Sequence, residues 1–267
     1  MPFHTVADGT RLFYTDSGTD GPVLLFIHGW TCDSHDWSWQ IPAFAPTFRV
    51  VAPDLRGHGR SSVAPSGYTP AGFAADLASL LDALGAMPAV VIGHSLGGAI
   101  AANLALADPE GVRAIVAIDS SYGPSSNDFD PPTLFATLRS PQCHEVVASI
   151  CAGLASPATP AALLTWHQRR GAGVPLEVIA ATSEGLLNED GGIGPTAEFL
   201  RERAVPVLAF HRNQVSADWE AATLPSDGHS TVVVWGEAGH WLHQERPAEF
   251  NEIVRAWISG LPISIDR

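Results

Sequence analysis

The stretch that decides the fold is PAVVIGHSLGGAIAANLALADP, residues 88–109. An apolar run, AVVIG, precedes a serine that stands between glycines, and a run rich in alanine and leucine follows it. Continuous apolar runs of this length are typical of strands that are buried on both faces of a parallel sheet. The pattern therefore predicts a strand, a tight turn at Ser95 and a helix over residues 95–107.

The serine lies in a pentapeptide that fits G-x-S-x-G, Gly93-His94-Ser95-Leu96-Gly97, with the strand before it and the helix after it that this pattern requires. The turn is so sharp that its flanking positions tolerate little side chain, hence glycine. It exposes the hydroxyl at the carboxyl edge of the sheet and at a helix N-terminus, where negative charge is favoured. We predict that Ser95 is a nucleophile rather than a spectator in a glycine-rich turn.

Strand and helix patterns alternate over the first part of the chain. RLFYTDSG, PVLLFIHG and FRVVAPD predict short strands. A helix with apolar residues at helical spacing follows, with Thr69 as its N-cap and Gly85 as its stop, and VRAIVAID is the next strand. This alternation favours an α/β fold, with a mostly parallel central sheet flanked by helices.

The rhythm changes between residues 120 and 203, where helical stretches follow one another without a convincing strand. Alternation resumes with VPVLAF and STVVVW and ends in an amphipathic helix over residues 247–259. We therefore predict a core domain made of residues 1–119 and 204–267, with residues 120–203 inserted as a helical cap, or lid.

Composition excludes several classes of function. Asp and Glu number 28 against 14 Lys and Arg, a net charge of −14, and lysine is absent. Such a chain is a poor candidate for binding nucleic acid or an anionic membrane, and it can run neither Schiff-base nor P-loop lysine chemistry. The first residues lack a signal-peptide pattern, and no apolar run has the length of a membrane span. The three cysteines are expected to be reduced, in a cytoplasmic monomer or homodimer.

The remaining parts of a serine nucleophile's machinery have candidates in sequence. His240 follows a strand and a glycine-rich loop late in the chain and is the expected base, whereas His243 is expected to cap a helix or face solvent. The backbone N–H groups of Leu96 and Trp30 are the expected oxyanion hole. The other histidines show no metal-ligand spacing, so neither a catalytic metal nor a cofactor is expected.

Four stretches, LLFIHGW, VVAPDLRGHGRSS, VVIGHSLGG and GHWLHQERPAEF, make the chain resemble the α/β-hydrolase family over its full length. The resemblance implies nucleophile, acid and histidine in chain order, and a helical cap where residues 120–203 fall. In most of the family the acid follows V-P-x-L-x-x-x-G-x-x-D. Here the glycine position holds Arg212 and the acid position holds Val215.

Two carboxylates are candidates for the missing acid. Asp218 lies three residues beyond the usual place, and Asp119 ends the strand that follows the nucleophile's helix. The resemblance extends to branches that take their acid from that strand end, including haloalkane dehalogenases, zearalenone-type lactonases and cofactor-free quinolone dioxygenases. The last residue of a parallel strand shares the sheet edge with Ser95. Asp119 is therefore favoured over Asp218, although an acid there can also simply cap a turn.

The expected substrate is a small hydrophobic or aromatic molecule, contacted by Trp30, His94, Trp166 and Trp241. The cap should influence its choice, through apolar residues of which many also pack on the core: Phe129, Phe135, Leu138, Leu163, Leu164, Trp166, Leu186 and Leu187.

Three functions follow from these residues. The first is a serine hydrolase that cleaves a small to medium hydrophobic ester or lactone through an acyl-enzyme. The alternative is a cofactor-independent dioxygenase of 3-hydroxy-4-quinolone-type heteroaromatics, in which a His/Asp dyad deprotonates the substrate. Leu96 and Ser120 depart from the residues that those dioxygenases carry. The third, a ligand-binding receptor with this fold, would not need Ser95, His240 and the oxyanion loop together.

Overall fold

The computed structural model describes residues 2–18, 20–120, 122, 130–186 and 194–262. Two of the apolar residues expected in the cap, Phe129 and Leu187, lie outside these ranges.

The centre of the molecule is an eight-stranded sheet with the order β1-β2-β4-β3-β5-β6-β7-β8. The strands are β1 (Phe3–Thr5), β2 (Arg11–Asp16), β3 (Val23–Ile27), β4 (Arg49–Pro53), β5 (Ala89–His94), β6 (Val112–Ile118), β7 (Val207–His211) and β8 (Thr231–Val234). Pairing is antiparallel between β1 and β2 and between β2 and β4, and parallel from β4 to β8. The prediction of a mostly parallel central sheet is confirmed.

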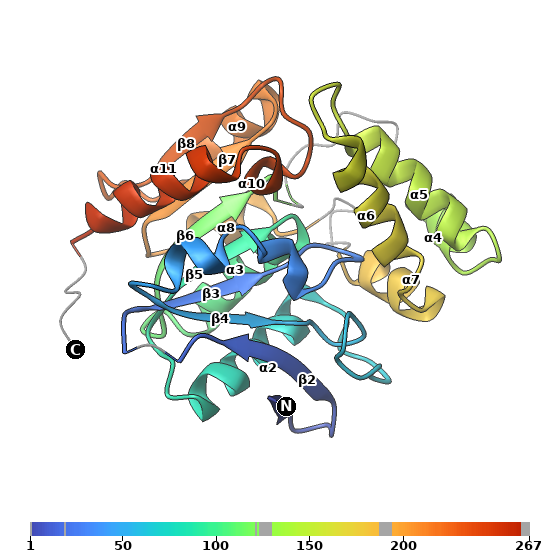
Figure 1. The fold of residues 1–267 in the computed structure, drawn as a ribbon, viewed down its shortest axis with the longest axis horizontal. Helices are drawn as coiled ribbons and strands as arrows, with labels where there is room; N and C mark the ends of the chain where they lie inside the picture. The colour runs from blue at the N-terminus through green and yellow to red at the C-terminus, as the bar shows by residue number, and fades with distance from the viewer. Residues whose placement is uncertain (1, 19, 121, 123–129, 187–193, 263–267) are drawn as a thin grey trace.

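Helices cover both faces of this sheet (Figure 1). In chain order the helical elements are η1 (Ser34–Trp37), α1 (Ile41–Phe44), α2 (Pro70–Ala83), α3 (Leu96–Ala107), α4 (Pro131–Leu138), α5 (Cys143–Leu154), α6 (Ala161–Gly171), α7 (Leu176–Gly185), α8 (Ala197–Arg201), α9 (Gln214–Ala221), α10 (Leu242–Glu245) and α11 (Pro247–Ser259). None of these described helices is both long and apolar enough to cross a lipid bilayer.

The central strands are apolar throughout because both of their faces are buried. In β3, Leu25 and Ile27 belong to the core that α2 and α3 cover, whereas Leu24 and Phe26 belong to the core on the other face, under α1 and α11. Successive side chains of a strand point to opposite faces. A strand with helices on both sides therefore loses the alternation of polar and apolar residues, as the AVVIG run already indicated.

The local signals of the sequence correspond to observed element ends. Thr69 caps α2, where its hydroxyl accepts a hydrogen bond from the Gly72 N–H, and Gly85 follows the helix with φ +55°. The last helix occupies residues 247–259 as predicted.

The residues between β6 and β7 carry α4 to α8, which we call the intervening helices. The described part of this segment contains no strand. In Figure 1, α4 to α7 form a group beside the sheet rather than on one of its two faces. Leu138 and Leu163 are buried in the core that includes α2 and α3, and Phe135, Leu164 and Leu186 pack against it from partly buried positions. These side chains hold the group in place.

Candidate active site

The turn between β5 and α3 places Ser95 in a conformation that few residues adopt, with φ 54° and ψ −116°. Two nearby positions, two residues before and two residues after the serine, must be glycine because backbone atoms come too close for a Cβ. A Cβ on Gly93 would lie 2.2 Å from the carbonyl oxygen of Gly97, and a Cβ on Gly97 would lie 2.3 Å from that of Ile27. Because β3 and β5 are adjacent and parallel, the second approach fixes α3 against the end of β3.

Asp119, the residue that follows β6, contacts His240 directly. The Nδ1 atom of His240 lies 2.6 Å from Oδ2 of Asp119, and the carboxylate is a tenth exposed. Asp119 itself has φ +40°, and its N–H donates to the carbonyl of Phe210 on β7. A carboxylate at Nδ1 orients the imidazole and leaves Nε2 to accept a proton.

The other candidate acid lies elsewhere. Asp218 is on α9, exposed to solvent, and its carboxylate accepts a hydrogen bond of 2.7 Å from the side chain of Gln214. The chain therefore brings Asp119 to His240, and it leaves Asp218 on the surface.

Two basic side chains from the end of β7 face the Asp119 carboxylate. Arg212 Nε lies 3.1 Å from Oδ2, and His211 Nδ1 lies 3.9 Å from Oδ1. Burial by itself would raise the pKa of Asp119, but the hydrogen bond from His240 and the charges of His240, Arg212 and His211 outweigh it and lower the pKa. Asp119 is therefore ionised at neutral pH.

The backbone N–H groups of Leu96 and Trp30 are the expected oxyanion donors. Leu96 opens α3, and Trp30 follows the tight His28-Gly29 turn after β3. Among the described residues, neither N–H donates to a backbone carbonyl. A Cβ on Gly29 would lie 3.3 Å from Cβ of Ser95, so this loop passes directly over the serine. The N–H of Leu96, at the N-terminus of α3, suits a developing negative charge.

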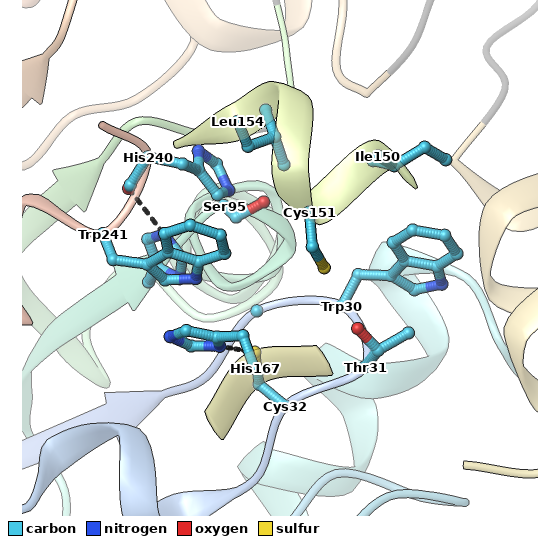
Figure 2. A pocket seen from close by; sticks show the side chains of 12 residues that line it. Trp30, Thr31, Cys32, Ser95, Ile150, Cys151, Leu154, His167, His240 and Trp241 are labelled. Atoms are coloured by element: carbon cyan, nitrogen blue, oxygen red, sulfur yellow. Dashed lines mark hydrogen bonds between the residues drawn. The ribbon is translucent and has the colours of Figure 1, made fainter. Parts of the chain in front are cut away.

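A cavity of about 40 Å³ opens at Ser95 and His240 (Figure 2). Its walls come from the loop after β3, the two turns that carry Ser95 and His240, and the intervening helices α5 and α6. They are formed by Gly29, Trp30, Thr31, Cys32, His94, Ser95, Ile150, Cys151, Leu154, His167, His240 and Trp241. Trp30, His94 and Trp241, three of the four residues expected to contact substrate, thus surround it.

The fourth expected contact residue, Trp166, does not line this cavity. Its indole packs edge-on against Trp39, with ring centroids 5.8 Å apart, and the Arg170 guanidinium lies over its ring. His167, the next residue of α6, enters the cavity instead and stacks on Trp241 at 4.2 Å. Neighbouring residues of a helix point about 100° apart, and on α6 this turns His167 towards the cavity and Trp166 towards Trp39.

The intervening helices supply four cavity residues that the sequence did not single out: Ile150, Cys151, Leu154 and His167. Their helical spacing was visible, but nothing local distinguishes the cavity face of α5 from its packing face. The contacts of His211 and Arg212 with Asp119 were also missed. The single available signal was the arginine at the position where most of the family has glycine.

His243 is fully buried, so the expectation that it caps a helix or faces solvent is wrong. Its ring lies 4.6 Å from that of Trp37 and 4.7 Å from that of His94, which in turn lies 4.5 Å from the ring of His240. The short helix α10 turns His243 inward, behind the loop that carries His240. His94 fixes that loop, because its Nε2 donates to the carbonyl of His240 at 3.0 Å.

Two groups of buried side chains have potential metal-ligand atoms within 4.8 Å of one another: Cys32, Asp36 and His167, and Asp36, His94 and His243. Both groups depend on Asp36, whose carboxylate already receives a hydrogen bond from the guanidinium of Arg170. A positive charge there opposes a cation, so neither group supports a metal-assisted step. The three cysteines are free and buried.

Comparison with known proteins identifies relatives of this site and fold. A family model described as the alpha/beta hydrolase fold matches residues 22–141. A bifunctional esterase/perhydrolase of Acinetobacter calcoaceticus is 34% identical over 232 residues, which are 79% of this chain and 81% of that protein.

Two solved structures extend the likeness over nearly the whole chain. A thermophilic esterase from Thermogutta terrifontis superposes with a TM-score of 0.81 and 26% identity over 96% of each chain. An enol-lactonase from Burkholderia xenovorans has a TM-score of 0.83 at 20% identity, over 97% of this chain and all of that one, and shows the shared fold alone.

The buried ring of His28, in the turn after β3, makes the free energy of unfolding depend on pH. Its Nε2 accepts from the Leu55 N–H at 3.0 Å and its Nδ1 donates to the Gly29 carbonyl at 2.8 Å, so only the neutral ring fits. Burial lowers its pKa to about 4. The unfolded chain binds this proton near the ordinary pKa of about 6.5, so the free energy of unfolding should fall by about 3 kcal/mol from this group between pH 6.5 and 4.

Urea denaturation across this pH range measures the effect. We expect His28→Asn to lower stability at pH 8 and to flatten the decline towards pH 4, whereas His35→Asn, at an exposed position, should leave the decline unchanged. An equally steep decline in His28→Asn would contradict the assignment.

Proposed function

We propose that this chain, which belongs to the α/β-hydrolase family of enzymes, cleaves small hydrophobic esters or lactones through an acyl-enzyme on Ser95. The observation that carries the proposal is the 2.6 Å contact between His240 and Asp119 beside a serine held in a strained turn. A nucleophile, a base and a group that orients the base make up the triad.

In the proposed mechanism, His240 Nε2 takes the proton of the Ser95 hydroxyl as its oxygen attacks the carbonyl carbon. Asp119 holds the ring and stabilises the imidazolium, and the N–H groups of Leu96 and Trp30 stabilise the oxyanion, at about 3 kcal/mol per donor. His240 then returns the proton to the departing alkoxide, which leaves as the alcohol. Water, activated by the same histidine, releases the acid.

The cavity supports a short acyl group. Its volume of about 40 Å³ accommodates only a few water-sized groups, and Ile150, Leu154 and Trp241 contribute apolar walls. We propose that the intervening helices act as a cap that sets this limit. The relative named as an esterase/perhydrolase and the thermophilic esterase support an ester as the substrate.

The alternative, a cofactor-independent dioxygenase, uses the same His240–Asp119 pair as a dyad. Those enzymes need the base to face a flat heteroaromatic substrate, for which a cavity of about 40 Å³ offers little room. The small cavity and the two available oxyanion donors favour acyl transfer.

Labelling with a fluorophosphonate tests the serine chemistry. We expect one adduct on Ser95, loss of ester turnover in step with labelling, and no adduct with Ser95→Ala, as intact mass and peptide mapping would record. Oxygen uptake with a 3-hydroxy-4-quinolone, in metal-free buffer and undiminished by Ser95→Ala, would replace this proposal by the dioxygenase.

Acyl-chain dependence tests the cavity. We expect kcat/KM for a p-nitrophenyl acetate or propionate to exceed that for the octanoate by about tenfold or more, because each misplaced methylene is worth about 1–3 kcal/mol. Ile150→Ala should narrow this ratio. Leu164→Ala, a partly buried position of α6 that packs on the core, is the matched control and should leave the ratio unchanged. A flat profile in the unaltered enzyme would refute the size limit.

Substitution of each carboxylate identifies the acid. Asp119→Asn keeps the size of the side chain but removes the charge that stabilises the imidazolium, and kcat should fall by about 10⁴. Asp218→Asn, on the surface, should cost less than about tenfold. Steady-state kinetics with the ester distinguish them. The reverse order would assign the acid to Asp218 through a rearranged loop.

A further inference from the structure

The end of β7, where most of the family carries its acid, here presents positive charge to Asp119. Arg212 makes two contacts with the carboxylate: its Nε lies 3.1 Å from Oδ2, the atom that also meets His240, and its backbone N–H lies 3.4 Å from Oδ1. Any residue other than proline at position 212 could make the backbone contact, whereas the contact from Nε requires arginine. One carboxylate oxygen is thus shared between a guanidinium and the imidazole.

The guanidinium is itself held in place. Arg212 Nη1 donates to the carbonyl of Leu154 at 3.4 Å, and that same carbonyl accepts the backbone N–H of His240 at 2.9 Å. Leu154 ends α5 and lines the cavity. The arginine therefore spans from the carboxylate to the helix that covers the site, and its side chain is 30% exposed.

Most of the other titratable side chains around His240 are uncharged. His94 on β5, His243 on α10 and His167 on α6 face it, and burial lowers the pKa of each, to about 4 for His167, so all three are neutral at working pH. Burial also raises the pKa of Cys151 on α5, to about 11.

Three groups remain around the catalytic ring. His211 meets the far oxygen of Asp119, and its Nε2 lies 3.5 Å from the buried Glu220. Glu245 accepts the N–H of Gly239, next to His240, at 2.8 Å. Arg212 is the charged group that shares the Asp119 oxygen with the ring.

We propose that Arg212 is a positioning residue that holds Asp119 in its rotamer and limits how strongly the carboxylate favours protonation of His240. The inference rests on the proposed hydrolase function. A positive charge at Oδ2 offsets part of the attraction between the carboxylate and the imidazolium. The acid limb of the pH profile should therefore report how the charge of Asp119 is divided between Arg212 and the imidazole.

The pH profile of kcat/KM tests this role. With Arg212→Gln we expect the acid limb to move to higher pH by about half to one unit, because the Asp119 charge then acts on the imidazole alone. Solvent attenuates the effect at this partly exposed position. Arg212→Lys keeps the charge and should return the limb to within about 0.2 units of wild type. Arg139→Gln removes an exposed ion pair between the end of α4 and Glu184 on α7 and should leave the limb in place.

The rate of Ser95 labelling by a fluorophosphonate, followed against pH, gives a second profile that needs no ester substrate. Agreement of both profiles with the expected shifts supports the role. A fall in kcat with an unmoved limb, or a shift that Lys fails to restore, overturns it and leaves the hydrolase function standing. If wild type neither labels nor turns over ester at any pH, both proposals fall.

Discussion

The site depends on one steric constraint, the close approach of backbone to backbone around Ser95. The carbonyl of Ile27 occupies the space beside Gly97, and the carbonyl of Gly97 occupies the space beside Gly93. These contacts force the serine into its strained φ and ψ values and hold α3 against the sheet. Such strain persists only where the surrounding structure over-determines it, and here parallel strands on both sides of β5 do so.

The second organising feature is the contact between an acidic side chain after one strand and basic side chains at the end of the neighbouring strand. Asp119 follows β6, and His211 and Arg212, at the end of β7 and directly after it, face its carboxylate. The two strands are paired in parallel, so their carboxyl ends lie at one edge. The acid follows β6 here, and it reaches His240 on a loop after β8 that hydrogen bonds to His94 on β5 and Glu245 on α10 also hold.

Local patterns in the sequence were sufficient for the strands β2 to β8, the turn at Ser95 and the last helix, because each depends mainly on neighbours in the chain. The first strand, β1, was not predicted. Asp119 could be favoured over Asp218 from its place at a strand end. The outward direction of Trp166 and the burial of His243 could not be inferred, because both depend on contacts with residues more than a hundred positions away. The cavity face of α5 was hidden for the same reason.

The carbonyl of Leu154 joins the covering helix to the reacting groups, since both the His240 N–H and the Arg212 side chain donate to it. With the proposed function, a motion of α5 that carried this carbonyl away to admit a larger molecule would break both hydrogen bonds, each worth about 1 kcal/mol. Entry of a large substrate and the ordering of His240 are thus thermodynamically linked, because His240 would be less ordered when α5 is displaced. A ligand small enough to enter without displacing α5 would keep both hydrogen bonds. A bulky ligand would have to offset their loss with its own contacts. Selection by size would then depend on the equilibrium between conformations as well as on the walls of the cavity.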